Sequence, residues 1–84
     1  MKYSDVQETI NRLTLTDLSI LASDLAESLD DVVLNESNPN FEGRNTNDDF
    51  DIFVRGLSNV EFFGLLHKVL RQIESAIAKQ DDAA

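Results

Sequence analysis

Apolar residues recur at helical spacing over two long stretches of the chain. In the first, Leu, Ala and Val side chains follow one another at intervals of three and four between residues 18 and 33, which places them on one face of a helix. Thr14 and Asp17 stand just before this stretch as a variant capping box, with Asp in place of the usual Glu. The pattern predicts a helix over residues 15–34.

The same start signal returns later in the chain. Ser58 and Glu61 form a full capping box, and the apolar face behind them is wider than the first. Such a wide face favours contacts on two sides of the helix or a place at a subunit interface. We expect this helix to run from residue 58 to about residue 79, with a frayed tail at residues 80–84.

A shorter amphipathic segment precedes each long helix, at about residues 4–13 and 48–57. The apolar spacing in the second short segment favours a helix over a strand. A shift of 44 positions lays residues 4–34 over residues 48–78, with matching caps and matching apolar positions. The chain therefore predicts two copies of one helical hairpin, a short helix and then a long one, which bury their apolar faces against each other.

These patterns predict an all-α fold, a single four-helix domain over residues 1–84 built from two pseudo-repeated hairpins. Hairpin one covers about residues 4–34 and hairpin two about residues 48–79. A polar connector rich in Asn, residues 35–47, joins them and is long for a link between helices; it is either functional or merely mobile. The expected core consists of Leu18, Leu21, Leu25, Leu29, Phe50, Phe53, Val54, Phe62, Leu65, Leu66, Val69 and Ile73.

The net negative charge of the chain makes some classes of binding partner unfavourable. Sixteen acidic residues against seven basic ones give a net charge of −9, which argues against direct binding to nucleic acid or to an anionic membrane surface. The longest apolar run, residues 32–34, is far shorter than the roughly 20 residues of a membrane span. No secretory signal pattern is visible at the N-terminus, so we expect a cytoplasmic protein.

One face of the first long helix combines acidic residues with a single branched aliphatic residue. The group consists of Asp17, Ile20, Asp24, Glu27 and Asp31. Such a face resembles an interface anchor in a charged surround, although a solvated helix face with one stray apolar residue is the more common explanation. The matching face of the second long helix carries basic residues, which leaves a homodimer with unlike faces together as a further possibility.

Little in the sequence points to catalysis or to metal binding. Cysteine is absent, which excludes disulfides, thiolate ligands and Cys nucleophiles. The one histidine, His67, has no evident nucleophile to activate. Residues 38–49 follow the calcium-loop pattern only in part, because they retain just two of its carboxylates, Glu42 and Asp49. We therefore expect no enzyme, no cofactor and no metal site, with weak cation binding by the connector left open.

The segment Glu27-Ser28-Leu29-Asp30 resembles the Asp-Ser-Leu attachment site of acyl carrier proteins, which are also acidic and four-helical. The resemblance covers these few residues and implies a carrier whose prosthetic group is attached to Ser28. The chain departs from the family pattern just before the serine, where Ala26 and Glu27 replace Gly and Asp. The periodicity also places Ser28 inside a helix, whereas the serine of the family opens one.

The leading hypothesis is a small acidic protein–protein interaction module without enzymatic activity. It is an adaptor, an inhibitor or an immunity-type partner that engages a basic surface through the acidic face of residues 17–31, with electrostatic steering of the encounter. A phage-type nucleic-acid mimic that inhibits a DNA- or RNA-binding enzyme is the alternative. A carrier protein is the third hypothesis.

Overall fold

The computed structural model describes residues 2–34 and 40–83. In this part of the chain all regular structure is helical and no strand occurs, so the chain folds as the all-α four-helix domain that the sequence predicts. The first long helix is broken into two pieces, which gives five helical segments. They are α1 (Tyr3–Arg12), α2 (Leu15–Glu27), α3 (Leu29–Val33), α4 (Asp48–Arg55) and α5 (Asn59–Ala83).

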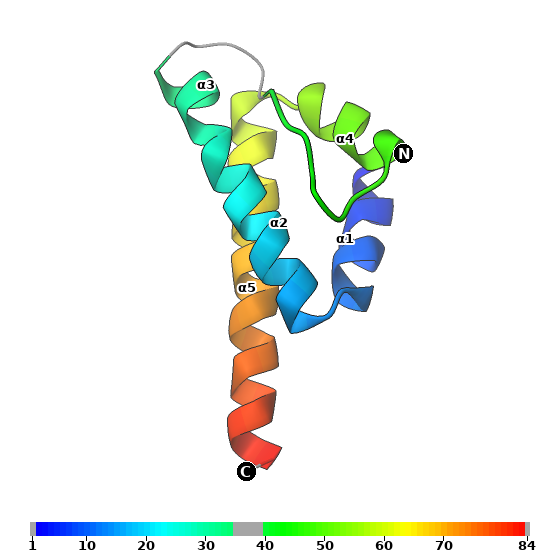
Figure 1. Ribbon diagram of the computed structural model, residues 1–84, viewed down its shortest axis with the longest axis vertical. Helices are drawn as coiled ribbons and strands as arrows, with labels where there is room; N and C mark the ends of the chain where they lie inside the picture. The colour runs from blue at the N-terminus through cyan, green and yellow to red at the C-terminus, as the bar shows by residue number, and fades with distance from the viewer. Residues whose placement is uncertain (1, 35–39, 84) are drawn as a thin grey trace.

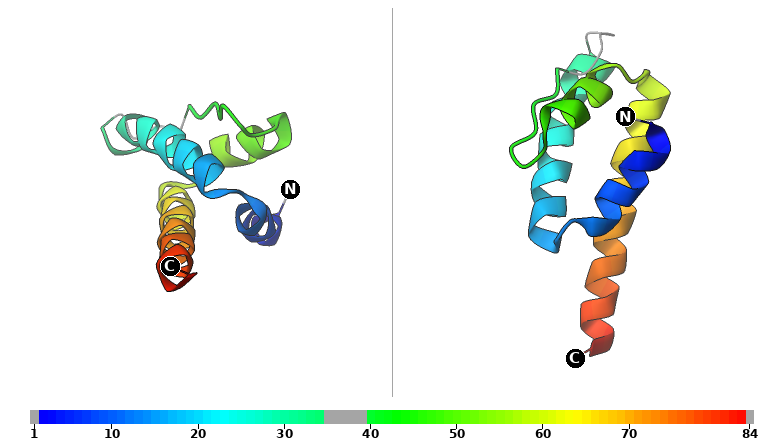
Figure 2. Two further views of the ribbon diagram at one scale, coloured as in Figure 1. Left: turned by 60° about the horizontal axis from the view of Figure 1, so that its bottom comes forward. Right: turned by 90° about the vertical axis from the view of Figure 1, so that its right-hand side faces the viewer.

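The longest helix, α5, is the axis of the molecule (Figure 1). Helix α2 runs antiparallel along it, and α1 packs against it from another side. Helix α4 lies across the upper part of the molecule, and residues 40–47 of the connector pass between α2 and the pair formed by α1 and α4. The C-terminal half of α5 extends beyond all other helices (Figure 2), which gives the molecule extents of 44 × 25 × 21 Å.

The predicted start signals of both long helices are present. The Thr14 hydroxyl accepts a hydrogen bond from the Asp17 N–H (3.2 Å). At α5 the box is reciprocal, because the Ser58 hydroxyl accepts from the Glu61 N–H and the Glu61 carboxylate accepts from the Ser58 N–H. Each bond satisfies a backbone donor that the first turn of a helix leaves without an intrahelical partner. Helix α4 is capped as well, because the Asn47 side chain accepts a hydrogen bond from the Phe50 N–H (2.9 Å).

The prediction of one continuous helix over residues 15–34 is wrong at one position. The chain leaves the regular helix at Ser28, whose N–H bonds to the carbonyl of Leu25, three residues back (3.1 Å), while its hydroxyl donates to the carbonyl of Asp24 (3.5 Å). Helix α3 then begins at Leu29 and buries Val32 in the core. The apolar spacing continues across Ser28 without a gap, so periodicity could not locate the break.

The other long helix extends further than expected. Helix α5 ends at Ala83 rather than near Lys79. It therefore includes most of the residues expected to form a frayed tail.

All twelve residues of the expected core lie in or against the observed one, eight of them buried and four partly buried. The connector adds a residue that the prediction lacked, because Phe41 is fully buried. Its ring lies 6.1 Å from that of Phe50, measured between centroids, in a tilted arrangement of the kind that aromatic pairs favour. The connector is thus tied to the core by a large apolar side chain and is not merely a polar link.

Candidate functional site

The acidic face predicted for partner binding lies against the chain's own connector. Asp24 is buried, with 5% of its surface exposed. Asp17, Ile20 and Asp31 are partly buried, and only Glu27 is fully exposed. The outward orientation expected for Asp24 is therefore wrong, because the connector covers this part of α2.

Asp24 binds the connector through both oxygens of its carboxylate. One oxygen accepts from the Arg44 backbone N–H (2.9 Å) and the other from the Arg44 Nε–H (2.8 Å). The guanidinium group itself remains largely exposed, whereas the carboxylate side chain is 4% exposed. Burial of a charge is costly unless it is paired and hydrogen-bonded, and Arg44 supplies both the opposite charge and the two donors.

Two further aspartates continue this row along α2 and α3. Asp17, Asp24 and Asp31 are spaced by seven residues, or about two helical turns, so their side chains lie on one side of the helices. Asp17 accepts from the Asn45 side-chain amide (2.8 Å), and Asp31 accepts from the Asn40 backbone N–H (3.3 Å). The three aspartates together hold the connector along α2 and α3.

Helix α4 binds the connector from the opposite side. Asp51, which is 8% exposed, accepts hydrogen bonds from the Gly43 N–H and the Thr46 hydroxyl. Arg55 donates through Nε to the carbonyl of Phe41 (2.8 Å). A side chain at position 43 would overlap that of Thr46, so Gly43 is required by this close approach.

The connector and the adjoining helices leave an open acidic hollow of about 390 Å³. We call it the acidic hollow; it is lined by Asp24, Glu27, Ser28, Asp31, Asn40 and Glu42. Glu27 is exposed and makes no hydrogen bond or ion pair within the described residues. The side chain of Glu42 is 84% exposed, and its carboxylate lies 4.0 Å from the guanidinium of Arg55. Four carboxylates therefore line one concave surface.

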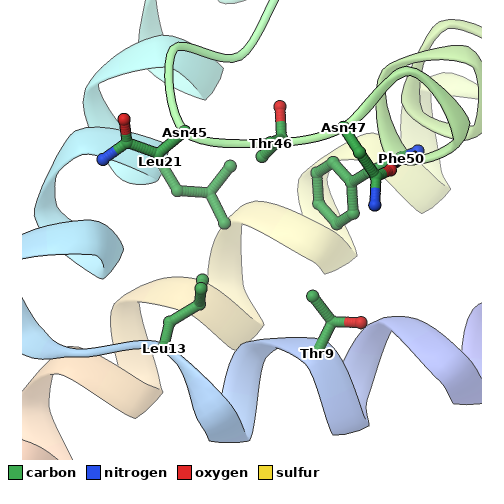
Figure 3. A pocket seen from close by; sticks show the side chains of 7 residues that line it. All are labelled: Thr9, Leu13, Leu21, Asn45, Thr46, Asn47 and Phe50. Carbon is green, nitrogen blue, oxygen red and sulfur yellow. Dashed lines mark hydrogen bonds between the residues drawn. The ribbon is translucent and has the colours of Figure 1, made fainter.

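A second, smaller hollow of about 100 Å³ lies between α1 and the connector. Leu13, which follows α1, and Leu21 of α2 approach it, and Phe50 forms one side (Figure 3). The Thr46 hydroxyl points away from it. Sites for small organic ligands usually measure about 300–1,000 Å³, so this hollow is an imperfection of packing rather than a ligand site.

The described residues offer no arrangement typical of a metal centre, because they contain no group of three His, Asp or Glu side chains able to hold an ion. The first two positions of the calcium-loop pattern, Asn38 and Pro39, lie outside the described residues. Gly43 matches the glycine of that pattern. Here its backbone does not adopt the left-handed conformation. Glycine is needed at this position because a larger residue would overlap the Thr46 side chain.

Ser28 and His67 occupy very different surroundings. Ser28 precedes α3 directly, so it does open a helix, contrary to our expectation. It is nevertheless 4% exposed and its hydroxyl donates to the Asp24 carbonyl. Attachment of a prosthetic group would require this serine to become exposed. His67 is exposed on α5, away from both hollows.

One carboxyl group has a clearly shifted pKa. The hydrogen bond from the Ser58 N–H, followed by the interaction with the Ser58 hydroxyl, lowers the pKa of Glu61 below its ordinary value of 4.5. Glu61 caps α5 and lies outside the acidic hollow. The shift therefore belongs to the start of the helix and not to a reactive site.

Comparison with protein-family models, with curated proteins and with solved structures finds no match. Within the described residues, no helix is both long and apolar enough to cross a membrane.

Proposed function

We propose that this protein is a non-enzymatic protein-binding module that engages a basic surface of another protein through the acidic hollow. The observation that carries the proposal is the concave surface lined by four carboxylates, of which those of Glu27 and Glu42 lie at its exposed parts. An Arg or Lys side chain of a partner fits such a surface by charge and by shape. The net charge of −9 adds long-range attraction to a basic partner.

The partner is a protein with a basic surface, as the sequence predicts. The acidic residues that bind it differ from those predicted. Asp17 and Asp24 hold the connector, so their carboxylates contribute mainly to the fold. Glu42 comes from the connector and lines the same hollow as Glu27 and Asp31. The partner-binding surface of the proposal therefore comprises Glu27, Asp31 and Glu42, with Ile20 as a neighbouring apolar residue on α2.

The test is a quantitative pull-down from the source cells with tagged protein, followed by mass spectrometry of what is captured. The double variant Glu27→Lys with Glu42→Lys reverses charge at the exposed parts of the hollow. Glu8→Lys is the control, because it reverses an exposed charge on α1. We expect a basic protein that is retained by the wild type and by the control, is lost with the double variant, and binds more weakly at high salt.

Equal recovery of the same proteins by the wild type and the double variant would contradict the proposal. Duplex DNA added during the pull-down separates the two binding hypotheses. A partner displaced by DNA favours the nucleic-acid mimic, whereas a partner retained in its presence favours an adaptor or inhibitor that binds elsewhere on the partner.

A further inference from the structure

One face of α5 carries exposed apolar residues along most of its length. We call this face the α5 stripe; its members are Val60, Phe63, His67, Leu70, Glu74 and Ile77. Its four apolar side chains are between 40% and 81% exposed, and its two polar side chains are exposed as well. The intervals between neighbouring members are three and four residues in strict alternation, which is the spacing of a coiled-coil seam.

Within the described residues, the side chains of this stripe remain exposed. Helices α1 and α2 pack on other sides of α5, where Val69 is buried and Lys68 donates to Gln7 of α1 (3.1 Å). Beyond the end of α2, the C-terminal half of α5 extends away from the other helices (Figure 2). Because an isolated helix of this length is marginal in water, a partner along the stripe would stabilise it.

The stripe is complementary to itself when two copies run in opposite directions. Relative to Leu70, Phe63 and Ile77 lie seven residues before and seven after, so they meet across an antiparallel pair centred at Leu70. His67 lies three residues before Leu70 and Glu74 four residues after it. In the antiparallel pair each His67 therefore lies beside the partner's Glu74, and an imidazole N–H donates to a carboxylate.

A parallel pair lacks this complementarity. It would place the two Glu74 carboxylates against each other, with repulsion between like charges, and would leave each His67 without a carboxylate across the seam. Only the antiparallel pair also brings the extended half of each α5 alongside the covered half of the other. Both the charges and the shape of the molecule therefore favour one orientation.

We propose that a second copy of this chain covers the α5 stripe, with the two α5 helices antiparallel about a two-fold axis at Leu70. The contact is isologous, because each copy presents the same stripe. The symmetric part of the seam, from Phe63 to Ile77, is about 21 Å long at 1.5 Å per residue. A seam of one helix pair belongs to the small class of interfaces, so we expect a weak dimer whose population depends on concentration.

The first experiment measures molar mass by light scattering and by sedimentation from micromolar to millimolar concentration. We expect a shift from 9.4 kDa towards twice that mass as the concentration rises. Leu70→Asp and Ile77→Asp should each weaken the dimer at least tenfold, because both place a carboxylate in the seam. Ser75→Asp, on another face of the extended half, is the control and should leave the dimer unchanged.

A monomer at every concentration would overturn the proposal, and so would a dimer that both seam variants leave intact. Ile77 lies in the extended half of α5 and is absent from the group of residues that form or line the core. Its replacement therefore tests the seam even if Leu70→Asp disturbs the fold.

The second experiment exchanges charges across the seam. His67→Glu and Glu74→Lys should each weaken the dimer, because each removes the attraction at both ends of the pair. The double variant should regain most of the affinity, since the introduced carboxylate of one copy then lies beside the introduced ammonium group of the other. A double variant that dimerises no more tightly than Glu74→Lys alone would overturn the antiparallel arrangement, because in a parallel dimer like charges would still face each other at both positions.

Introduced cysteines give an independent test of orientation, because the chain has none of its own. Under oxidation, a mixture of Phe63→Cys and Ile77→Cys chains should form the mixed disulfide. Either variant alone should form little covalent dimer. Efficient cross-linking of Phe63→Cys chains to one another would contradict the proposed orientation.

Failure of these experiments would leave the proposed function intact, because the acidic hollow and the α5 stripe share no residue. In the antiparallel dimer, by contrast, a basic partner would find two acidic hollows on one particle. Such a particle gains avidity wherever a partner offers two basic sites at the matching distance.

Discussion

At the scale of single residues, Asp24 illustrates how a buried charge can hold a loop. It accepts two hydrogen bonds from Arg44, a residue 20 positions away in the chain. Among the described residues no buried side-chain nitrogen or oxygen lacks a partner. The helix pattern correctly places Asp24 in one row with Asp17 and Asp31 on α2 and α3. Its burial depends on where the connector lies, which the pattern of α2 does not contain.

Replacement of Asp24 by Ala should therefore destabilise the protein. Loss of two hydrogen bonds to a charged acceptor costs about 2 kcal/mol, and the connector residues around Arg44 should lose protection against amide hydrogen exchange. Glu27→Ala is the control, since Glu27 lies on the same helix and is exposed; its effect should stay within about 0.5 kcal/mol. Urea unfolding of the two variants measures the difference, and equal midpoints would contradict this role of Asp24.

Glu61 gives a prediction about pH. Its pKa in the folded protein lies below 4.5 because the Ser58 N–H and hydroxyl interact with its carboxylate, so the unfolded chain binds more protons around that pH. The resulting stabilisation is present above about pH 4.5 and is lost as the pH falls through the folded pKa.

The measurement is the unfolding free energy of the wild type and of Glu61→Gln over this pH range. Gln keeps the shape of the side chain but cannot carry the charge. The wild type should be the more stable protein at neutral pH, and the difference should shrink below pH 4.5. A difference that stayed constant with pH would argue against the charged cap.

At the scale of elements, the sequence predicts best those features that depend on neighbouring residues. The capping groups Thr14 and Ser58 and the apolar spacing behind them locate the starts of α2 and α5, because these signals are local. The break at Ser28 is less visible, since it leaves the spacing of apolar residues intact. The packing of the connector depends on pairs such as Asp31 with Asn40, which no single periodicity reveals.

Phe41 is the clearest signal of the connector's packing that the sequence analysis missed. A single large aromatic residue in a polar stretch is more simply explained by burial than by exposure, because leaving a phenylalanine in water forgoes about 1.5–3 kcal/mol. In the structure it is fully buried against Phe50. The arrangement of residues 40–47 therefore depends on one core residue as well as on the aspartates of α2 and α3.

Phe41→Ala should accordingly destabilise the domain by about 3 kcal/mol or more, because it leaves a cavity in the core. A domain of this size has a total stability of about 3–5 kcal/mol, so we expect partial unfolding at room temperature. Leu34→Ala is the control, since Leu34 is 73% exposed. Circular dichroism during thermal unfolding compares them; a variant as stable as the control would show that the connector does not depend on Phe41.

At the scale of the whole molecule, α5 separates two kinds of apolar surface. One side packs against α1 and α2 and includes Phe62, Leu65 and Val69, all fully buried. The other side bears the α5 stripe and faces solvent. The wide apolar arc that the sequence shows on this helix thus covers both an internal contact and a surface that is exposed among the described residues.

The same substitution, to Asp, at the neighbouring positions 69 and 70 should have different effects on these two surfaces. Val69→Asp buries an unpaired carboxylate in the core and should unfold the protein, as should Leu25→Asp at the facing surface of α2. Leu70→Asp places the same carboxylate at a position that is 49% exposed, so the helical signal and cooperative unfolding of the monomer should persist.

Circular dichroism with urea titration measures the stability of both variants, and sedimentation measures the mass of Leu70→Asp. A folded Val69→Asp variant would mean that the register of α5 is displaced, so that position 69 no longer lies in the core. The core and the α5 stripe would then both be misplaced, because a helix rotated enough to expose Val69 turns the stripe towards its neighbours. One pair of variants therefore tests the internal packing and the proposed seam together, since the register of a single helix determines both.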